Sequence, residues 1–161
     1  MKLCKKFSTK LIKDTIIRAH YNSKNKKEDY YKNLEGFKLQ YSDENYFEAI
    51  NNAKLILFNH DSTGMLEMFA LNKPTLCMWE KGYQHNNAHV IEDYKLLKEA
   101  QILFDDPDEL YKHLVKIWNN PSEWWYSDNV QDSLNKFVKL YSRIPSKNFV
   151  RDFTNIIKDI I

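Results

Sequence analysis

The sequence of 161 residues contains only three glycines, four prolines and two cysteines. The scarcity of glycine and proline excludes collagen-like and low-complexity chains, which are rich in these residues. The two cysteines, Cys4 and Cys77, are too few for the disulfide framework of a small secreted domain or for a four-cysteine zinc site. Cys77 stands inside an apolar run, where a reduced and buried thiol is the usual state.

Long hydrophobic runs and an excess of one charge sign are also missing. No apolar run approaches the roughly 20 residues needed to span a bilayer, and the basic N-terminal segment lacks the continuous hydrophobic stretch of a signal peptide. Lys and Arg number 24 against 22 Asp and Glu, a formal net charge of +2. This balance provides no basic footprint for nucleic acid. We therefore expect a cytoplasmic protein that binds no nucleic acid.

The residues that are present predict one folded domain. Hydrophobic residues make up 43% of the chain and aromatic residues 14%, which is enough side-chain volume for a sizeable core. The length suits a single domain, because domains most often run to about 100 to 150 residues. Residues 1–161 are therefore expected to form one domain.

Segments typical of strands alternate with segments typical of helices. Apolar and β-branched runs predict strands at residues 15–20, 37–41, 55–58, 75–79 and 101–104. Helices are predicted between them, one of them beginning at Ser42 and another spanning Gly64 to Leu71. The alternation predicts right-handed crossovers and a parallel sheet of about five strands. Residues 55–58 show no polar alternation, so we expect them to form the buried central strand.

The C-terminal third is predicted to be helical. Asp106 followed by Pro107 is a strong helix start, and Asn120 followed by Pro121 repeats it. Apolar residues then recur at helical spacing to the end of the chain. The predicted fold class is therefore α/β, a Rossmann-like three-layer domain with a parallel sheet of about five strands and a helical tail over residues 106–161.

Polar clusters follow the first and the third predicted strands, RAHYN and NHDSTG. In open parallel sheets, ligands bind outside the carboxyl ends of the strands. Ser62, Thr63 and Gly64 are small enough to let a phosphate reach the backbone N–H groups of a helix start, and Glu67 could accept hydrogen bonds from a ribose diol. The alternative is that Gly64 is an N-cap and Glu67 its capping-box acid. Spacing alone does not decide between the two.

Other candidate side chains lie at the same predicted edge. Arg18 and His20 point to the same side of the first strand and could serve a phosphate or act in proton transfer, although a lone strand-end histidine is more often structural. His60 and Asp61 could position the loop or simply be solvated. Trp79 could stack on a base or sugar, and core packing explains it equally well.

Metal and cofactor motifs are missing. His85, His89 and Glu92 have helical spacing, but they lack a fourth ligand and the HExxH pattern. The motifs GxGxxG and GxxxxGK[ST] are also absent, which argues against dinucleotide and P-loop chemistry. We expect neither a metal nor a cofactor.

Three segments resemble the C-terminal region of bacterial surface-carbohydrate transferases with the two-domain GT-B architecture: IIRAHY, LILFNHDSTGMLEMFALNKPTLCMW and LLKEAQILFDDPDELYKHLVKIWNNPSEWW. In that family a Rossmann-like C-terminal domain holds the activated sugar donor through a Ser/Thr/Gly loop and a Glu on the next helix. The R-x-H element is similar to one in CDP-glycerol glycerophosphotransferases, where the His serves the phosphate or the chemistry. Here Tyr21 replaces the proline that often follows that histidine.

The resemblance implies a donor site and a reaction. It implies that the donor, a nucleotide-diphosphate sugar or polyol, is bound by the loop and the glutamate, at Thr63, Gly64 and Glu67. The other expected donor-binding residues, from the polar cluster and the next strand end, are His60, Asp61, Ser62 and Trp79. Arg18 and His20 would be the catalytic residues. A GT-B enzyme also needs an N-terminal acceptor domain, so we expect such a domain or a partner chain to complete the site. The expected location is the cytoplasm, with peripheral association at the inner face of the membrane allowed.

Two alternatives stay open. One is a non-catalytic nucleotide-binding or assembly module that acts with a partner chain and docks through the apolar face of the last helix. The other is a phosphate- or nucleotide-binding Rossmann domain of another class.

Overall fold

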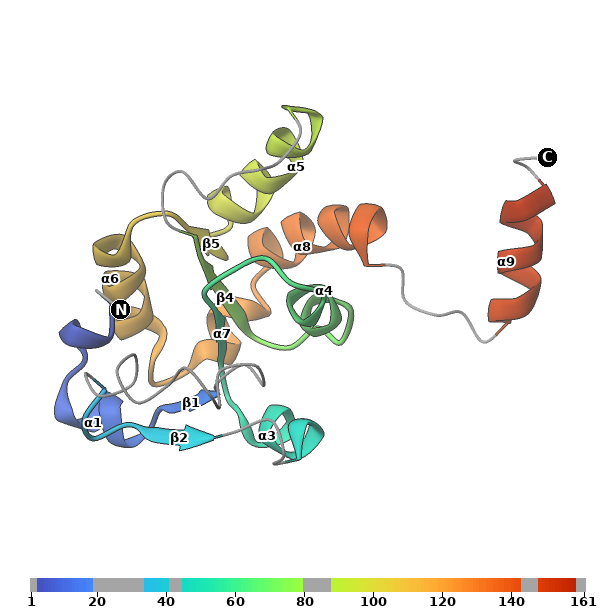
Figure 1. Ribbon diagram of the computed structural model, residues 1–161. Coiled ribbons are helices and arrows are strands. Elements are labelled where there is room, and N and C mark those ends of the chain that lie inside the picture. The colour runs from blue at the N-terminus through green and yellow to red at the C-terminus, as the bar shows by residue number, and fades with distance from the viewer. Residues whose placement is uncertain (1–2, 19–33, 41–44, 80–87, 143–147, 159–161) are drawn as a thin grey trace.

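The computed structural model describes residues 3–18, 34–40, 45–79, 88–142 and 148–158, and the structural statements below concern these residues. Its described strands and helices alternate from β2 to β5, which confirms the α/β class (Figure 1). In chain order the elements are the 3-10 helix η1 (Cys4–Lys6), α1 (Thr9–Lys13), β1 (Ile16–Arg18), β2 (Lys38–Gln40), α3 (Tyr46–Asn52), β3 (Ile56–Phe58), α4 (Thr63–Ala70), β4 (Thr75–Met78), α5 (Ala88–Glu99), β5 (Leu103–Phe104), α6 (Pro107–Ile117), α7 (Pro121–Trp125), α8 (Asp128–Tyr141) and α9 (Phe149–Lys158).

The described strands form two parallel sheets instead of the single sheet of about five strands that the sequence predicted. Strand β1 pairs with β2, with Arg18 opposite Gln40. The second sheet has the order β3-β4-β5, with Cys77 of β4 opposite Phe58 and Leu103. Because all pairings are parallel, the carboxyl ends of β3, β4 and β5 meet at one edge of their sheet.

The buried central strand is β4, so the prediction for residues 55–58 was wrong. All four residues of β4 are buried, whereas Leu57 in β3 is 40% exposed. The continuous apolar run at 55–58 suggested cover on both faces, but β3 stands at the edge of the three-stranded sheet, where one side chain can face outward. Hydrophobicity alone does not distinguish an edge strand from a central one.

Helices cover both faces of the β3-β4-β5 sheet, which confirms the three-layer arrangement. Side chains of β4 alternate, so Cys77 and Trp79 enter one core and Leu76 and Met78 the other. The first core is closed mainly by α4, α5 and α8, with Met65, Phe69, Leu97, Val130, Leu134 and Phe137. The second is closed by α6 and the N-terminal segment, with Leu3, Leu110, Leu114 and Ile117. Figure 1 shows α6 across the sheet from α4 and α8.

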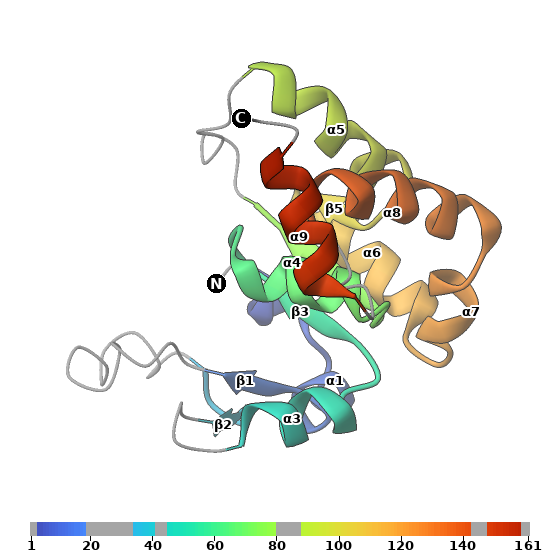
Figure 2. The same ribbon diagram turned by 90° about the vertical axis from the view of Figure 1, so that its right-hand side faces the viewer.

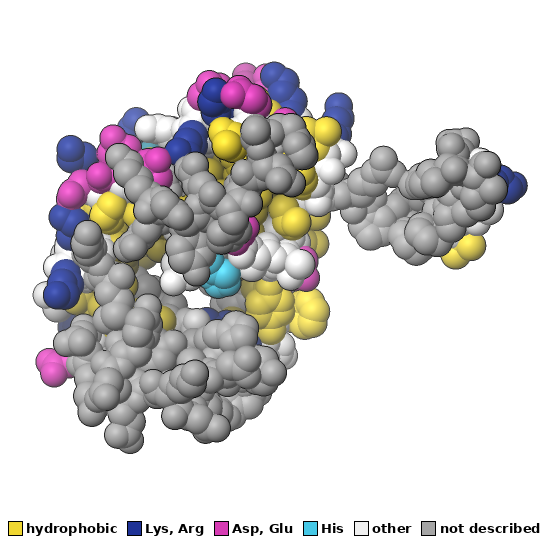
Figure 3. Space-filling model, turned by 45° about the horizontal axis from the view of Figure 1, so that its top comes forward, with side chains coloured by type: hydrophobic (Ala, Val, Ile, Leu, Met, Phe, Trp, Pro, Cys, Tyr) yellow, Lys and Arg dark blue, Asp and Glu magenta, His cyan; other side chains and the backbone are white. Residues whose placement is uncertain are grey.

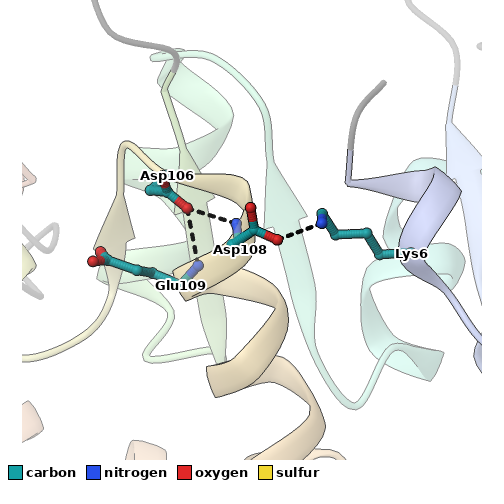
Figure 4. Close-up of polar contacts among 4 residues, drawn as sticks. All are labelled: Lys6, Asp106, Asp108 and Glu109. Atoms are coloured by element: carbon teal, nitrogen blue, oxygen red, sulfur yellow. Dashed lines mark hydrogen bonds and ion pairs between the residues drawn. The ribbon is translucent and has the colours of Figure 1, made fainter.

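Helix α6 begins as the sequence predicted, at an aspartate cap. The Asp106 carboxylate accepts hydrogen bonds from the backbone N–H groups of Asp108, at 2.7 Å, and Glu109, at 3.1 Å (Figure 4). An ion pair between Lys6 and Asp108 joins the N-terminal segment to this helix start. The Asn120 side chain, in contrast, makes no cap bond and donates to the Glu123 carboxylate at 3.2 Å.

Two helices end in residues with left-handed backbone, just before β4 and β5. Asn72 has φ 51° and Gln101 has φ 58°. After each, the next N–H reaches back across the helix end, from Lys73 to the Met68 carbonyl at 2.9 Å and from Ile102 to the Leu97 carbonyl at 2.8 Å. Both ends are therefore Schellman motifs built without glycine.

The C-terminal residues are helical where they are described, as expected. Helices α7 and α8 contribute to the first core, whereas α9 stands away from the other helices in Figure 1. The side chains expected to form the apolar face of this last helix, Phe149, Phe153, Ile156, Ile157 and Ile160, lie outside the described residues. None of the described helices is both long enough and apolar enough to cross a membrane.

Candidate functional site

The turn between β3 and α4 differs from simple helix capping. The N-cap is Ser62, whose side chain makes no cap hydrogen bond, and the helix begins at Thr63. Gly64 is thus the second helical residue and Glu67 the fifth, so the capping-box alternative is wrong. The first N–H groups of a helix have no intrahelical acceptor and carry partial positive charge. This helix start can therefore accept an anion.

Gly64 stands at a tightly packed position. A Cβ built there would lie 3.3 Å from Cε1 of Phe58 and 3.5 Å from the hydroxyl oxygen of Tyr46. Any side chain at this position would press on the Phe58 ring. The glycine therefore lets α4 approach both β3 and α3 closely, which brings Tyr46 to the helix start.

Tyr46 joins two residues that the sequence analysis had placed in separate clusters. Its hydroxyl donates to Oε2 of Glu67 at 3.4 Å, and the Arg18 guanidinium carbon lies 5.5 Å from the centre of its ring. Arg18 also donates from Nη1 to Oε1 of Gln40 at 3.0 Å, across the β1–β2 pair. Figure 2 shows α3 beside β1 and β2, with β3 and α4 above them. The structure thus brings Arg18 and Glu67 together through Tyr46.

The environment of Tyr46 keeps its hydroxyl protonated. Burial raises the pKa of Tyr46, and the charge and hydrogen bond of the Glu67 carboxylate raise it further, while Arg18 opposes the shift. A phenol with a raised pKa remains a hydrogen-bond donor at neutral pH. Tyr46 can therefore hold a carboxylate, and it is poorly suited to act as a base.

Local structure explains why the start of the helix that carries Tyr46 was misplaced. The helix was predicted to begin at Ser42, a residue outside the described ranges, but α3 begins at Tyr46, capped by Asn45. The Asn45 side chain accepts hydrogen bonds from the N–H groups of Phe47, at 3.1 Å, and Glu48, at 3.2 Å. The next residue of this helix, Phe47, is 73% exposed. Recognising Asn45 as the cap would have placed Tyr46 in the first turn.

A second group of predicted residues gathers around Tyr94 of α5. The Trp79 ring packs against the Tyr94 ring with centroids 4.8 Å apart. Burial raises the pKa of Tyr94, and the Asp61 carboxylate raises it further. Trp79 is 5% exposed and belongs to the first core, as its packing interpretation predicted. Its indole N–H has no hydrogen-bond partner within the described structure.

Of the histidines selected from the sequence, only one has a described side chain. His60 is exposed, and its Nδ1 lies 2.8 Å from Oδ1 of the neighbouring Asn59. His20 and His85 lie outside the described residues, as does the side chain of His89. Within the ranges that are described, no three His, Cys, Asp or Glu side chains are grouped to hold a metal ion.

The arrangement combines three chemical functions near the β3–α4 turn. A helix start offers N–H groups to an anion, Glu67 offers an exposed carboxylate to hydroxyl donors, and Arg18 offers a guanidinium held close by. In Figure 3, Lys and Arg side chains lie interspersed with Asp and Glu over the described part of the face shown. A local cation–anion set on a surface of mixed charge suits a small ligand with phosphate and hydroxyl groups.

Comparison with known proteins identifies the family. No curated protein and no solved structure matches the chain. A family model, described as LIC12162 family transferase, matches residues 1–156 and so covers the elements described above except for the end of α9. The chain therefore belongs to the LIC12162 family of transferases.

Proposed function

We propose that this chain binds the donor substrate of a glycosyltransferase-like reaction in cell-surface polysaccharide synthesis. The donor is a nucleotide-diphosphate sugar or polyol, its diphosphate held by Ser62, Thr63 and Gly64 and its ribose by Glu67. The observation that carries the proposal is the uncapped start of α4 beside an exposed carboxylate and a nearby guanidinium. Membership of a transferase family supports it.

The remaining residues complete the proposed reaction. Arg18 stabilises the negative charge that develops on the leaving diphosphate, because a guanidinium pairs strongly with phosphate oxygens. His20 serves the same phosphate or transfers a proton. His60 and Asp61 border the donor, and Trp79, which packs in the first core, lies behind them at the end of β4. No cofactor or metal takes part in the proposal.

The proposed enzyme has the GT-B architecture and is related to the CDP-glycerol glycerophosphotransferases. This chain supplies its donor-binding half, and an N-terminal acceptor domain or a partner chain supplies the acceptor and the base that activates it. We place the reaction in the cytoplasm, at the inner face of the membrane, where surface polymers are assembled from cytoplasmic donors.

Calorimetry with UDP, CDP and GDP and their sugar or polyol derivatives tests the proposal. We expect one nucleotide class to bind, and Glu67→Ala to weaken it by roughly 10- to 100-fold, because a hydrogen bond to a charged group contributes about 1.5 to 3 kcal/mol. Glu99→Ala is the matched control, since Glu99 is an exposed glutamate at the end of α5. Absence of binding to the unmutated chain would refute donor binding.

Turnover separates catalysis from a purely binding role. Donor hydrolysis or transfer by the chain, alone or with an added acceptor domain, supports the transferase proposal. Nucleotide binding without turnover under both conditions supports the alternative, a non-catalytic module that acts with a partner chain.

A further inference from the structure

We propose that Tyr46 is a positioning residue of the donor site, which fixes Glu67 for the ribose and holds Arg18 on the phosphate side. The inference rests on the proposed function and deepens it, because it names the residue that couples the two halves of the site.

Glu67 needs such a partner. Its side chain is exposed, so without a contact its carboxylate would sample several rotamers and lose entropy on binding a ligand. The hydrogen bond from Tyr46 engages only Oε2. An ionised carboxylate has about four lone-pair sites, so Oε1 and the second lone pair of Oε2 can still accept from a ribose diol.

The position of Tyr46 is itself well determined. Asn45 caps α3 immediately before it, and Gly64 leaves its hydroxyl the space to reach α4. Tyr46 is thus held at a defined helix start, and it can restrain the Glu67 carboxylate, which would otherwise be mobile.

The ring of Tyr46 makes a separate contact, with Arg18. The Arg18 guanidinium lies within cation–π range of it, and Gln40 accepts a hydrogen bond from the same guanidinium. The hydroxyl and the ring therefore act on two different residues, and two substitutions can separate them. Tyr46→Phe removes only the bond to Glu67, whereas Tyr46→Leu also removes the contact with Arg18.

The test is a binding cycle on the full chain with the nucleoside diphosphate that binds best among UDP, CDP and GDP. We expect Tyr46→Phe to weaken binding by about 3- to 10-fold in the presence of Glu67. We expect no further loss when Tyr46→Phe is added to Glu67→Ala. The matched control is Tyr111→Phe, on a half-buried tyrosine of α6 that stacks on Phe7.

A ligand without ribose hydroxyls distinguishes positioning from a general structural effect. The 2′,3′-dideoxynucleoside diphosphate should bind equally to Tyr46→Phe and the unmutated chain, whereas Tyr46→Leu should weaken this ligand too.

The outcomes of the two proposals differ. Nucleotide binding that Tyr46→Phe leaves unchanged, or weakens equally for ribose and dideoxyribose ligands, overturns the positioning role and leaves the donor site standing. Failure of the unmutated chain to bind any of the nucleotides overturns both.

Discussion

His113 lies on the inner side of α6, with its ring between those of Phe104 and Trp124. The ring centroids are 5.4 Å and 5.0 Å away, and His113 is only 5% exposed. Its Nε2 has no hydrogen-bond partner within the described residues. Burial, with a contribution from Lys116, lowers the pKa of His113 to about 4. The folded protein therefore holds this imidazole neutral.

Because of the lowered pKa of His113, we expect the folded protein to lose stability in mild acid. The unfolded chain protonates His113 near its ordinary pKa of 6.5, whereas the folded chain does so only near pH 4. Between these values the unfolded state binds more protons than the folded state. The contribution of His113 to the free energy of unfolding therefore falls by up to about 1.4 kcal/mol per pH unit as the pH drops. Above pH 6.5 this contribution is constant.

Urea unfolding of the unmutated chain and of His113→Phe, at several pH values from 7.5 to 4, measures the effect. Phenylalanine keeps a ring in the aromatic cluster and removes the proton site. We expect the stability of the unmutated chain to fall relative to the variant as the pH passes below 6.5. A constant difference across the series would contradict the assignment.

At the residue scale, the sequence predicted part of the candidate site. Arg18 and Glu67 were both selected because polar side chains at the ends of parallel strands converge. Tyr46 was missed because its role depends on a contact with another element. Its partner Glu67 lies 21 residues further along the chain. Such contacts leave no periodic pattern in the sequence.

The turn after α4 shows how one residue connects several elements. The Asn72 side chain accepts from the indole Nε1 of Trp125 at 2.8 Å and exchanges hydrogen bonds with the Gln131 amide at 3.1 and 3.2 Å. The Asn72 backbone carbonyl also accepts from the same indole at 3.1 Å. The turn is thus bound to α7 and α8, and it fixes where β4 begins.

Two substitutions at Asn72 separate backbone from side chain. Asn72→Gly keeps the left-handed conformation and loses the side-chain bonds, which should cost about 1 to 2 kcal/mol. Asn72→Ala loses the same bonds but keeps a Cβ at positive φ, so it should cost about 1 kcal/mol more than Asn72→Gly. Gln131→Ala measures the loss of the amide contacts together with the hydrogen bond from Gln131 to the Trp125 carbonyl, at 2.8 Å. Urea midpoints measure all three, and equal stabilities of the Gly and Ala variants would contradict the backbone argument.

At the element scale, caps and periodicity carried most of the prediction. Asp106 was correctly expected to cap α6, since a carboxylate before Pro107 satisfies the first N–H groups. The predicted strands all contain described strands, but shorter ones. The central position was assigned to residues 55–58 instead of β4 because both runs are apolar, and only pairing shows which strand has neighbours on both sides.

At the scale of the whole molecule, the two cysteine thiols are buried to different extents. Cys4 is half-buried near the N-terminus, whereas Cys77 is fully buried in β4. Burial raises the pKa of the Cys77 thiol far above its ordinary value. Because the thiolate is the reactive form, Cys77 should react only when the central sheet opens.

Labelling with an aromatic disulfide reagent tests this difference. In the native protein Cys4 should react first, and in the Cys4→Ser variant the labelling of Cys77 should follow the population of unfolded chains. Its dependence on urea should then match the slope of global unfolding. Rapid labelling of Cys77 without urea would show that the sheet opens locally.

For the whole molecule, the sequence predicted the three-layer arrangement but not the division of the described strands into two sheets. Alternation of strands and helices is a local pattern, so it could be recognised along the chain. The separation of β1–β2 from β3–β4–β5 depends on which strand edges meet in space. The polar link through Tyr46 crosses between the two sheets, which is why the site depends on that arrangement.

The turn at Gln101 has a consequence for protein engineering. Its exposed side chain occupies a left-handed position that glycine adopts without strain, directly before a buried strand. Neither Schellman turn uses one of the three glycines of the chain. Gln101→Gly is therefore a first substitution to try for a more stable variant for crystallisation, because it requires no new contact.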